Sequence, residues 1–191
     1  MPIATTVRTI SIDEAERRVQ QGAAYLDPRS VSDYLDVHVP GSISLQWEFG
    51  PGMQQRARDC IPLEVPLIVL QDGATDPSRI AAALRGKGFA VVGTVEDGLR
   101  TWAKLGATPA STEIHDRSEA PGGTVVDVGD PGVRRFDDAV LVSVEKLWSQ
   151  ASRLAERAPL AILAGRGVRA AMAVGMLERA GVRDLVFWRR P

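Results

Sequence analysis

The stretch PLAILAGRGVRAAMAVGMLERAGV at 159–182 decides the fold, because it passes from a buried strand through a glycine loop into a helix. The same order recurs in PLIVLQDGATDPSRIAAALRGKGF at 66–89. There the apolar run Leu67–Leu70 is too short for a helix and does not alternate, which is typical of a strand buried on both faces of a parallel sheet. Strands that alternate with helices predict an α/β protein.

A second pair of matching segments indicates an internal duplication. TVVDVGD, which contains Asp127, resembles AYLDPRS, which contains Asp27. Aligning these two aspartates gives an offset of 100, whereas aligning Pro159 with Pro66 gives 93, so the second copy is shorter in its middle by 7 residues. We therefore predict two tandem units, each a parallel sheet flanked by helices, with the second unit abbreviated.

A change in composition marks the boundary between the copies. From 108 to 123 proline, glycine, serine and charged residues displace the apolar periodicity, which predicts a linker. The expected arrangement is a complete unit at 1–107 and a shortened unit at 124–191, packed together as one compact protein.

The individual elements follow from apolar spacing and helix caps. Ser11 and Glu14 form an S-x-x-E capping box at the start of a helix. The strand expected at 182–187 should lie near a sheet edge, where another chain could pair with it. We further expect strands at 23–26, 67–70 and 90–95 and helices at 79–88, 99–104, 144–155 and from 168 onward.

Composition excludes several classes of partner and site. The 23 basic and 24 acidic residues give a net charge of −1, which removes the electrostatic case for nucleic acid or an anionic membrane as partner. One cysteine, Cys60, excludes a disulfide scaffold, and with only His38 and His115 beside it we expect no metal and no cofactor. The start MPIATTVRTI lacks a signal sequence, and no apolar run approaches about 18 residues, so we expect a cytoplasmic protein.

The loop AGRGVR, at the carboxyl end of a predicted strand, is where an open parallel sheet places its ligand. Its two glycines allow successive N–H groups to point inward, and the following helix adds the positive end of its dipole. The alternative is that the glycines only form a tight turn and the arginines are solvated. The predicted anion-binding residues are Gly165, Arg166, Gly167, Val168 and Arg169.

These motifs resemble the rhodanese-like sulfurtransferases, whose active-site loop has the form C-x-x-G-x-R. AGRGVR is similar to that loop at Gly167 and Arg169. In the first copy DPR at 27–29 resembles the family's D-V-R, HVPGSI at 38–43 its H-I-P-G-A-I, and DGLRTW at 97–102 its G-G-x-x-x-W. The resemblance covers nearly all of the first copy from residue 10. It is weaker in the second, which lacks the H-x-P-G element.

Neither loop has the thiol that becomes a persulfide in this family. Ala164 stands at the nucleophile position of the second copy, and Asp72 stands there in the first, as in the noncatalytic half of tandem rhodaneses. An alanine methyl cannot carry sulfur. The resemblance therefore implies no catalytic residue and a catalytically inactive binding or scaffolding module, with a small oxyanion or a protein as partner.

Two alternatives keep sulfur transfer open. In the first, position 164 is natively cysteine, and Arg166 and Arg169 steer an anionic sulfur donor toward it. In the second, Cys60 carries the persulfide, with nearby arginines that stabilise its thiolate. The opposing interpretation of Cys60 is a small, half-buried packing residue. For His38, within H-x-P-G, we predict ring hydrogen bonds that stabilise a turn rather than a role as base.

Overall fold

The duplicated pattern forms two separate parallel sheets in the computed structural model, which describes residues 6–47, 52–130 and 132–190. The strands of the first sheet are β1 (Ala24–Asp27), β2 (Ile43–Ser44), β3 (Leu67–Leu70) and β4 (Val91–Val95). Their order is β2-β1-β3-β4, and all neighbours are parallel. A parallel bridge between Thr9 and Thr94 extends this sheet beyond β4.

The first unit has five helices in the described residues, and the first of them begins at the predicted Ser11 cap. They are α1 (Ile12–Gln20), α2 (Val31–Asp36), α3 (Gly52–Cys60), α4 (Pro77–Arg85) and α5 (Gly98–Ala103). The Ser11 hydroxyl accepts a hydrogen bond from the Glu14 N–H at 3.2 Å, as the capping box requires. The patterns did not reveal α2 or α3, because α2 has only six residues and α3, GMQQRARDC, is largely polar.

The first strand of the second sheet lies before residue 124, where the sequence predicted that the second unit begins. Its strands are β5 (Glu113–His115), β6 (Thr124–Asp127), β7 (Val140–Leu141), β8 (Leu160–Leu163) and β9 (Leu185–Trp188). Their order is β5-β9-β8-β6-β7, all parallel. The segment 108–123, expected as linker, thus supplies the edge strand β5. The expectation that 182–187 lies near a sheet edge is wrong, because β5 covers β9.

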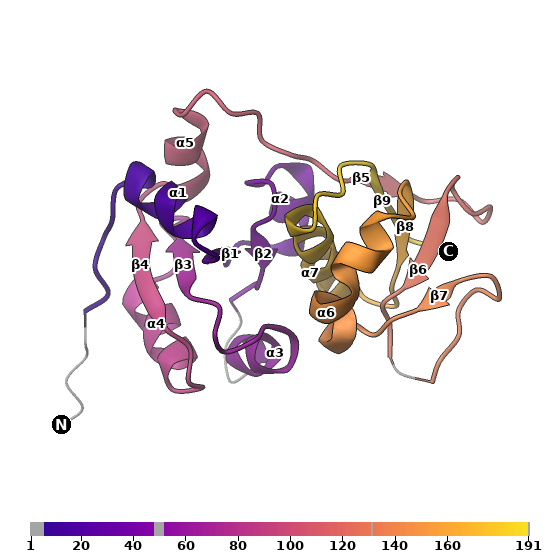
Figure 1. The fold of residues 1–191 in the computed structure, drawn as a ribbon, viewed down its shortest axis with the longest axis horizontal. Coiled ribbons are helices and arrows are strands. Elements are labelled where there is room, and N and C mark those ends of the chain that lie inside the picture. Colours follow the sequence, from indigo (N-terminus) through magenta and orange to yellow (C-terminus); the bar gives the residue numbers. More distant parts are fainter. Residues whose placement is uncertain (1–5, 48–51, 131, 191) are drawn as a thin grey trace.

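The helices of the second unit lie between the two sheets (Figure 1). They are α6 (Val144–Ala155), which has the predicted bounds, and α7 (Gly167–Arg179). Thr9 pairs with β4 as β5 pairs with β9. If Thr9 is counted as the first strand of its unit, the strands of the two sheets have the same order. Within the described residues, the second unit is therefore shorter because it has fewer helices than the first, whereas its strands correspond to those of the first. The prediction of an α/β fold with two tandem units, each a parallel sheet flanked by helices, is confirmed.

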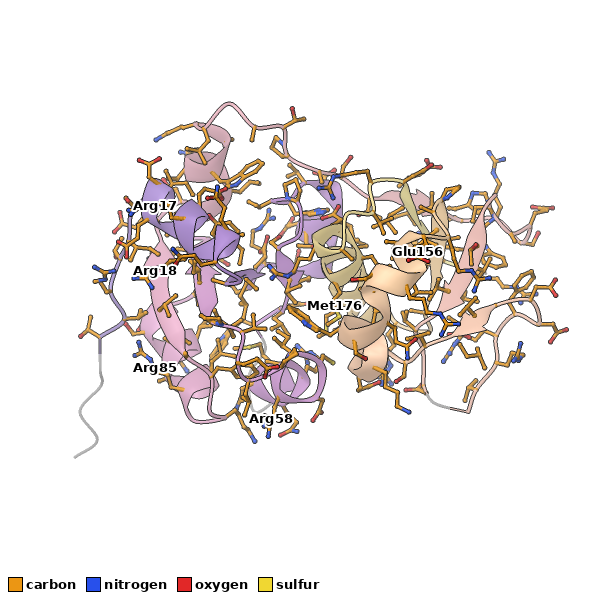
Figure 2. All side chains as sticks on the ribbon, in the orientation of Figure 1. Arg17, Arg18, Arg58, Arg85, Glu156 and Met176 are labelled. Carbon is orange, nitrogen blue, oxygen red and sulfur yellow. The ribbon has the colours of Figure 1, made fainter. Side chains whose placement is uncertain are left out.

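The two units share one apolar core. Leu26 and Ile43 of the first unit belong to the same buried cluster as Leu147 and Met176 of the second. Figure 2 shows Met176 in the seam between the units, whereas Arg17 and Arg58 lie on the outside of the first unit. Helix α7 packs against β2 and α2, and α6 packs against α3.

Gly175 marks the closest approach across this seam. A Cβ atom at this position would lie 2.0 Å from the Ser42 carbonyl oxygen and 3.0 Å from the Tyr34 hydroxyl. Only a residue without a side chain allows α7 to lie this close to the first unit.

Two further features concern the whole described chain. Its helices are all too short or too polar to cross a membrane. Within the ranges that the structure describes, no group of three or more His, Cys, Asp or Glu side chains could hold a metal ion.

Candidate functional site

The loop AGRGVR connects β8 to α7, as predicted, and lies against the first unit. Ala164 is buried directly after the strand, and α7 begins at Gly167. The Arg166 carbonyl accepts hydrogen bonds from the N–H groups of Arg169 and Ala170. In the described part of the chain, the N–H groups of residues 165–168 donate to no acceptor. These four amides therefore lie at the positive end of the α7 dipole and have no acceptor among the described protein groups.

The two glycines of this loop are required for a different reason from the predicted one. Neither has a positive φ, so the turn itself does not demand them. A Cβ at Gly165 would lie 3.0 Å from Nη2 of Arg135, and a Cβ at Gly167 would lie 3.2 Å from Cγ1 of Val31. Gly165 therefore leaves room for an arginine, and Gly167 allows the loop to approach α2 of the first unit.

The structure separates the two predicted arginines. The Arg169 guanidinium is held by carboxylates, with Nη1 2.8 Å from Oε1 of Glu145 and Nη2 3.1 Å from Oδ1 of Asp130. Arg166 is exposed and forms no ion pair with any described residue. Arg166 is thus the arginine of the motif that remains unpaired, while Arg169 already has two counter-ions.

Arg135 is a site residue that the sequence interpretation missed. Its Nη1 lies 3.1 Å from Oδ1 of the buried Asp127, and its backbone N–H donates to Oδ2 of the same carboxylate at 3.1 Å. In the first unit Asp27 is bound in the same way by Arg29, two residues later, at 2.7 Å. The second unit has Gly129 at the position equivalent to Arg29, so its arginine comes from further along the chain.

Gly129 makes this substitution possible. A Cβ there would lie 1.7 Å from Nη1 of Arg135, so the guanidinium occupies the space of a missing side chain. A buried aspartate without a basic residue two positions later is the signal that could have pointed to a distant arginine, because buried carboxylates need a partner.

The position of the family's nucleophile differs between the two loops. Ala164 offers only a methyl group. In the first unit the carboxylate Oδ1 of Asp72 accepts hydrogen bonds from the N–H groups of Ala74 at 2.9 Å and Thr75 at 3.1 Å. The first loop therefore binds its own carboxylate, whereas the amides of the second loop have no such partner. This geometry fits the structural role expected for Asp72.

Cys60 lies at the end of α3, in the seam between α3 and α6. It is 5% exposed and lines a cavity of about 270 Å³ with Glu145 and Trp148. Burial, together with the nearby carboxylates of Glu145 and Asp59, raises the pKa of its thiol to about 12 despite the opposing charges of Arg169 and Arg56. At neutral pH this thiol is protonated, which is the opposite of the activated thiolate that persulfide transfer needs.

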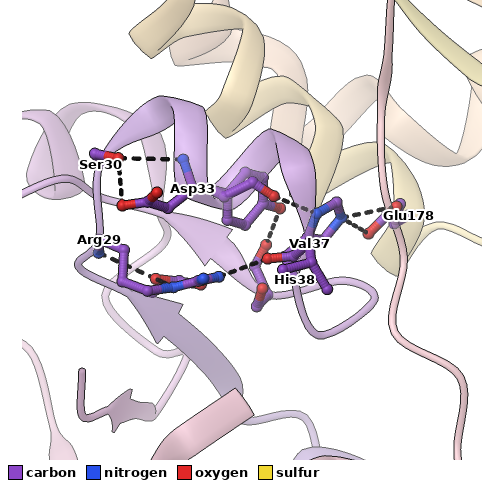
Figure 3. A network of polar contacts seen from close by, with 9 residues as sticks. Arg29, Ser30, Asp33, Val37, His38 and Glu178 are labelled. Atoms are coloured by element: carbon purple, nitrogen blue, oxygen red, sulfur yellow. Dashed lines mark hydrogen bonds and ion pairs between the residues drawn. The ribbon is translucent and has the colours of Figure 1, made fainter. Parts of the chain in front are cut away.

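His38 forms a buried contact with Glu178 near the C-terminal end of α7, between the two units (Figure 3). Its Nδ1 lies 2.7 Å from the Tyr34 carbonyl oxygen, and its ring stacks on Tyr34 at 4.1 Å. Its Nε2 lies 3.1 Å from both carboxylate oxygens of Glu178 on α7, and Oε2 of that carboxylate also accepts the Gly41 N–H at 2.7 Å. Both ring nitrogens therefore face oxygen atoms, one within its own turn and one on the other unit. His38 thus stabilises its turn, as predicted, and also joins the units.

Comparisons with known proteins complete this description. No family model matches the sequence, and no curated protein matches it. Solved structures similar to this chain include a rhodanese-like domain and sulfurtransferases. The rhodanese-like domain of an Anabaena protein is 22% identical, with 56% of this chain and 80% of that chain covered and a TM-score of 0.46. A thiosulfate sulfurtransferase from Pseudomonas aeruginosa is 15% identical, with 96% and 43% covered and a TM-score of 0.42. A 3-mercaptopyruvate sulfotransferase from Escherichia coli is 14% identical, with 97% and 99% covered and a TM-score of 0.44.

Proposed function

We propose that this protein is a binding module with a rhodanese-like fold that does not transfer sulfur, and that its loop AGRGVR binds a small oxyanion. The observation that carries this proposal is the combination of four N–H groups without acceptors at residues 165–168 and a methyl group at Ala164. Amides at a helix N-terminus favour an anion. A methyl group cannot form the covalent bond to sulfur on which transfer depends.

The first unit provides an internal comparison. Its loop holds the Asp72 carboxylate on the N–H groups of Ala74 and Thr75, and this contact supports an anionic group as the occupant of the second loop. The second loop has the amides without the carboxylate. This difference supports assignment of the binding function to the second unit and a structural role to the first.

Two experiments test the proposal. In a thiosulfate-to-cyanide assay we expect no thiocyanate from the unmodified chain, and turnover by this chain would refute the absence of catalysis. In an NMR titration with thiosulfate or sulfate we expect the amide signals of residues 165–168 to shift. Arg166→Gln should weaken this binding, whereas Arg17→Gln on the outside of α1 should not. Unchanged amide signals would refute the binding function.

Sulfur transfer from position 164 remains the second candidate function, because the surrounding loop resembles an active site. Ala164→Cys in the same assay decides it. If the variant gains one sulfur atom from thiosulfate and passes it to cyanide, only the thiol is missing from the loop. An inert variant that still binds sulfate would show that the loop serves binding alone. The Cys60 route is disfavoured by the burial and the raised pKa of that thiol.

A further inference from the structure

A cavity of about 280 Å³ lies between the two units at the C-terminal end of α7, which is the opposite end from the loop AGRGVR. Its walls come from α1, β1, α5 and the turn after His38 in the first unit, and from the last turn of α7 and the residues that follow it in the second. The volume lies just below the range of about 300–1,000 Å³ that is typical of sites for drug-sized ligands, so the cavity suits a small molecule.

The first unit contributes a carboxylate that has no basic partner. Oε1 of Glu16 accepts hydrogen bonds from the Tyr25 hydroxyl at 2.7 Å and from the Trp102 indole N–H at 3.1 Å. Both aromatic side chains are buried, so they hold the carboxylate in one position. Burial and the hydrogen bond to Glu16 raise the pKa of Tyr25, and its hydroxyl therefore stays protonated as a donor. Among the described residues Glu16 forms no ion pair, and its Oε2 accepts no hydrogen bond.

The second unit contributes two guanidinium groups that have no carboxylate partner in the described part of the chain. Arg179 donates to the Ala23 carbonyl at 3.0 Å, and burial of its side chain lowers its pKa. Arg183 is exposed, and its Nη1 donates to the Glu178 carbonyl at 2.9 Å. Its Nε and Nη2 donate to no described residue. Arg183 therefore keeps two donor nitrogens for a ligand, whereas Arg179 is an anchor that adds positive charge.

The remaining charged group at this cavity already has its partners. The Glu178 carboxylate faces the His38 ring and accepts the Gly41 N–H. Glu16 and the two arginines line the same cavity, yet no ion pair joins them. A charged group that is partly removed from water is stabilised by a partner of opposite charge. The cavity thus presents a carboxylate from one unit and guanidinium groups from the other, with space between them.

We propose that this cavity binds a free α-amino acid with an apolar side chain. The ammonium group of the amino acid donates to the Glu16 carboxylate, and its carboxylate accepts from the Arg183 guanidinium, whose fork of donors matches two oxygen atoms. Its side chain lies against Val19 and Val39, the aliphatic residues of the wall. A simple anion is repelled by Glu16 and a simple cation by the arginines, so the cavity selects a molecule that carries both charges.

An NMR titration with L-leucine tests the proposal through the Trp102 indole N–H, which donates directly to Glu16. We expect this signal to shift, whereas the indole signal of Trp188, which donates to the Arg117 carbonyl in the second unit, should not. Two related probes each lack one charge: 4-methylpentanoate has no ammonium group, and 3-methylbutylamine has no carboxylate. Each should bind at least about tenfold more weakly than L-leucine, because one hydrogen bond between charged groups is lost.

Variants identify the two protein groups. Glu16→Gln removes the charge but keeps an oxygen acceptor for both aromatic donors, so the fold should persist. Glu16→Gln and Arg183→Gln should each weaken L-leucine binding at least about tenfold. Glu156→Gln and Arg58→Gln, at exposed positions outside the cavity, are the matched controls and should leave the affinity unchanged.

Three results would overturn the proposal. If neither L-leucine nor L-methionine shifts the Trp102 indole signal, the cavity is not an amino-acid site and Glu16 only holds α1 against its neighbours. If either singly charged probe binds as tightly as L-leucine, the requirement for both charges is wrong. If the control variants weaken binding as much as Glu16→Gln and Arg183→Gln, the effect reflects net charge alone. None of these results depends on sulfate binding at residues 165–168, which tests the proposed function separately.

Discussion

Replacement of Gly175 with alanine tests the packing of α7 against the first unit. In an exposed helix the same change stabilises a protein, because alanine favours the helix by about 1 kcal/mol relative to glycine. At Gly175 the added Cβ would lie 2.0 Å from the Ser42 carbonyl oxygen, and contacts below 3.0 Å are essentially never observed for a real Cβ. The close partner is backbone, which cannot rotate away. The seam between α7 and the first unit must therefore open, and Gly175→Ala should destabilise the protein instead of stabilising it.

The size of the effect follows from what the opening disturbs. Forced separation of well-packed elements costs about 1–3 kcal/mol. The Tyr34 hydroxyl, which donates to the same Ser42 carbonyl at 2.6 Å, would also lie 3.0 Å from the new atom. If this buried hydrogen bond breaks, its unpaired groups cost about 1–3 kcal/mol more. After subtraction of the gain in helix propensity, Gly175→Ala should lower the free energy of unfolding by about 1–5 kcal/mol.

Urea unfolding followed by tryptophan fluorescence measures this change. Gly86→Ala is the matched control, since a Cβ at this helix C-cap would meet only carbonyl oxygens at 3.4 Å and the backbone has an ordinary helical conformation. Its free energy of unfolding should change by no more than about 0.5 kcal/mol. A Gly175→Ala protein as stable as the unmodified chain, or more stable, would show that α7 does not lie this close to β2.

Three further predictions concern other buried groups. Glu178→Gln removes the buried carboxylate that faces the His38 ring and accepts the Gly41 N–H, and it should lower the free energy of unfolding in urea by about 2–4 kcal/mol; no loss would show that this contact does not hold the two units together. Because the pKa of Cys60 is raised to about 12 by burial, iodoacetamide at pH 8 should alkylate it at least about tenfold more slowly in the folded chain than in urea, and equal rates would contradict the burial. Gly129→Ala displaces the Arg135 guanidinium and should cost about 1–3 kcal/mol of unfolding free energy. Gly122→Ala, where a Cβ would meet nothing, should cost much less.

Elements that depend on local pattern could be predicted from the sequence. The unalternating run Leu67–Leu70 is β3, and the helical spacing over Val144–Ala155 is α6, each with the expected bounds. Ser11 caps α1 because the S-x-x-E pattern involves groups only three residues apart. The strand–loop–helix order also placed AGRGVR correctly between β8 and α7. In each case the information lies within a few residues of the element.

Features that depend on distant partners could not be predicted in this way. β5 has three residues and one apolar side chain, Ile114, and it is a strand only because β9 pairs with it. Arg135 and Asp127 are eight positions apart in the sequence, and no periodic pattern of residues indicates that they pair. The requirement for Gly165 comes from that same arginine and not from the local backbone conformation. Sequence spacing therefore located the loop but not the charges that surround it.

The contacts of α7 explain why a loop in the second unit depends on the first. The helix carries the loop at its N-terminus, where Gly167 lies against Val31, and carries Glu178 in its last turn, where His38 binds it. These two positions are about 16 Å apart along a rigid helix, so the first unit fixes both ends. Next to Glu178, the Arg179 guanidinium donates to the Ala23 carbonyl at 3.0 Å and adds a second anchor. A shift of the C-terminal contacts would tilt the helix and move the loop amides with it. The first unit, whose own loop is closed by its aspartate, thus holds α7 and the loop at its N-terminus in position.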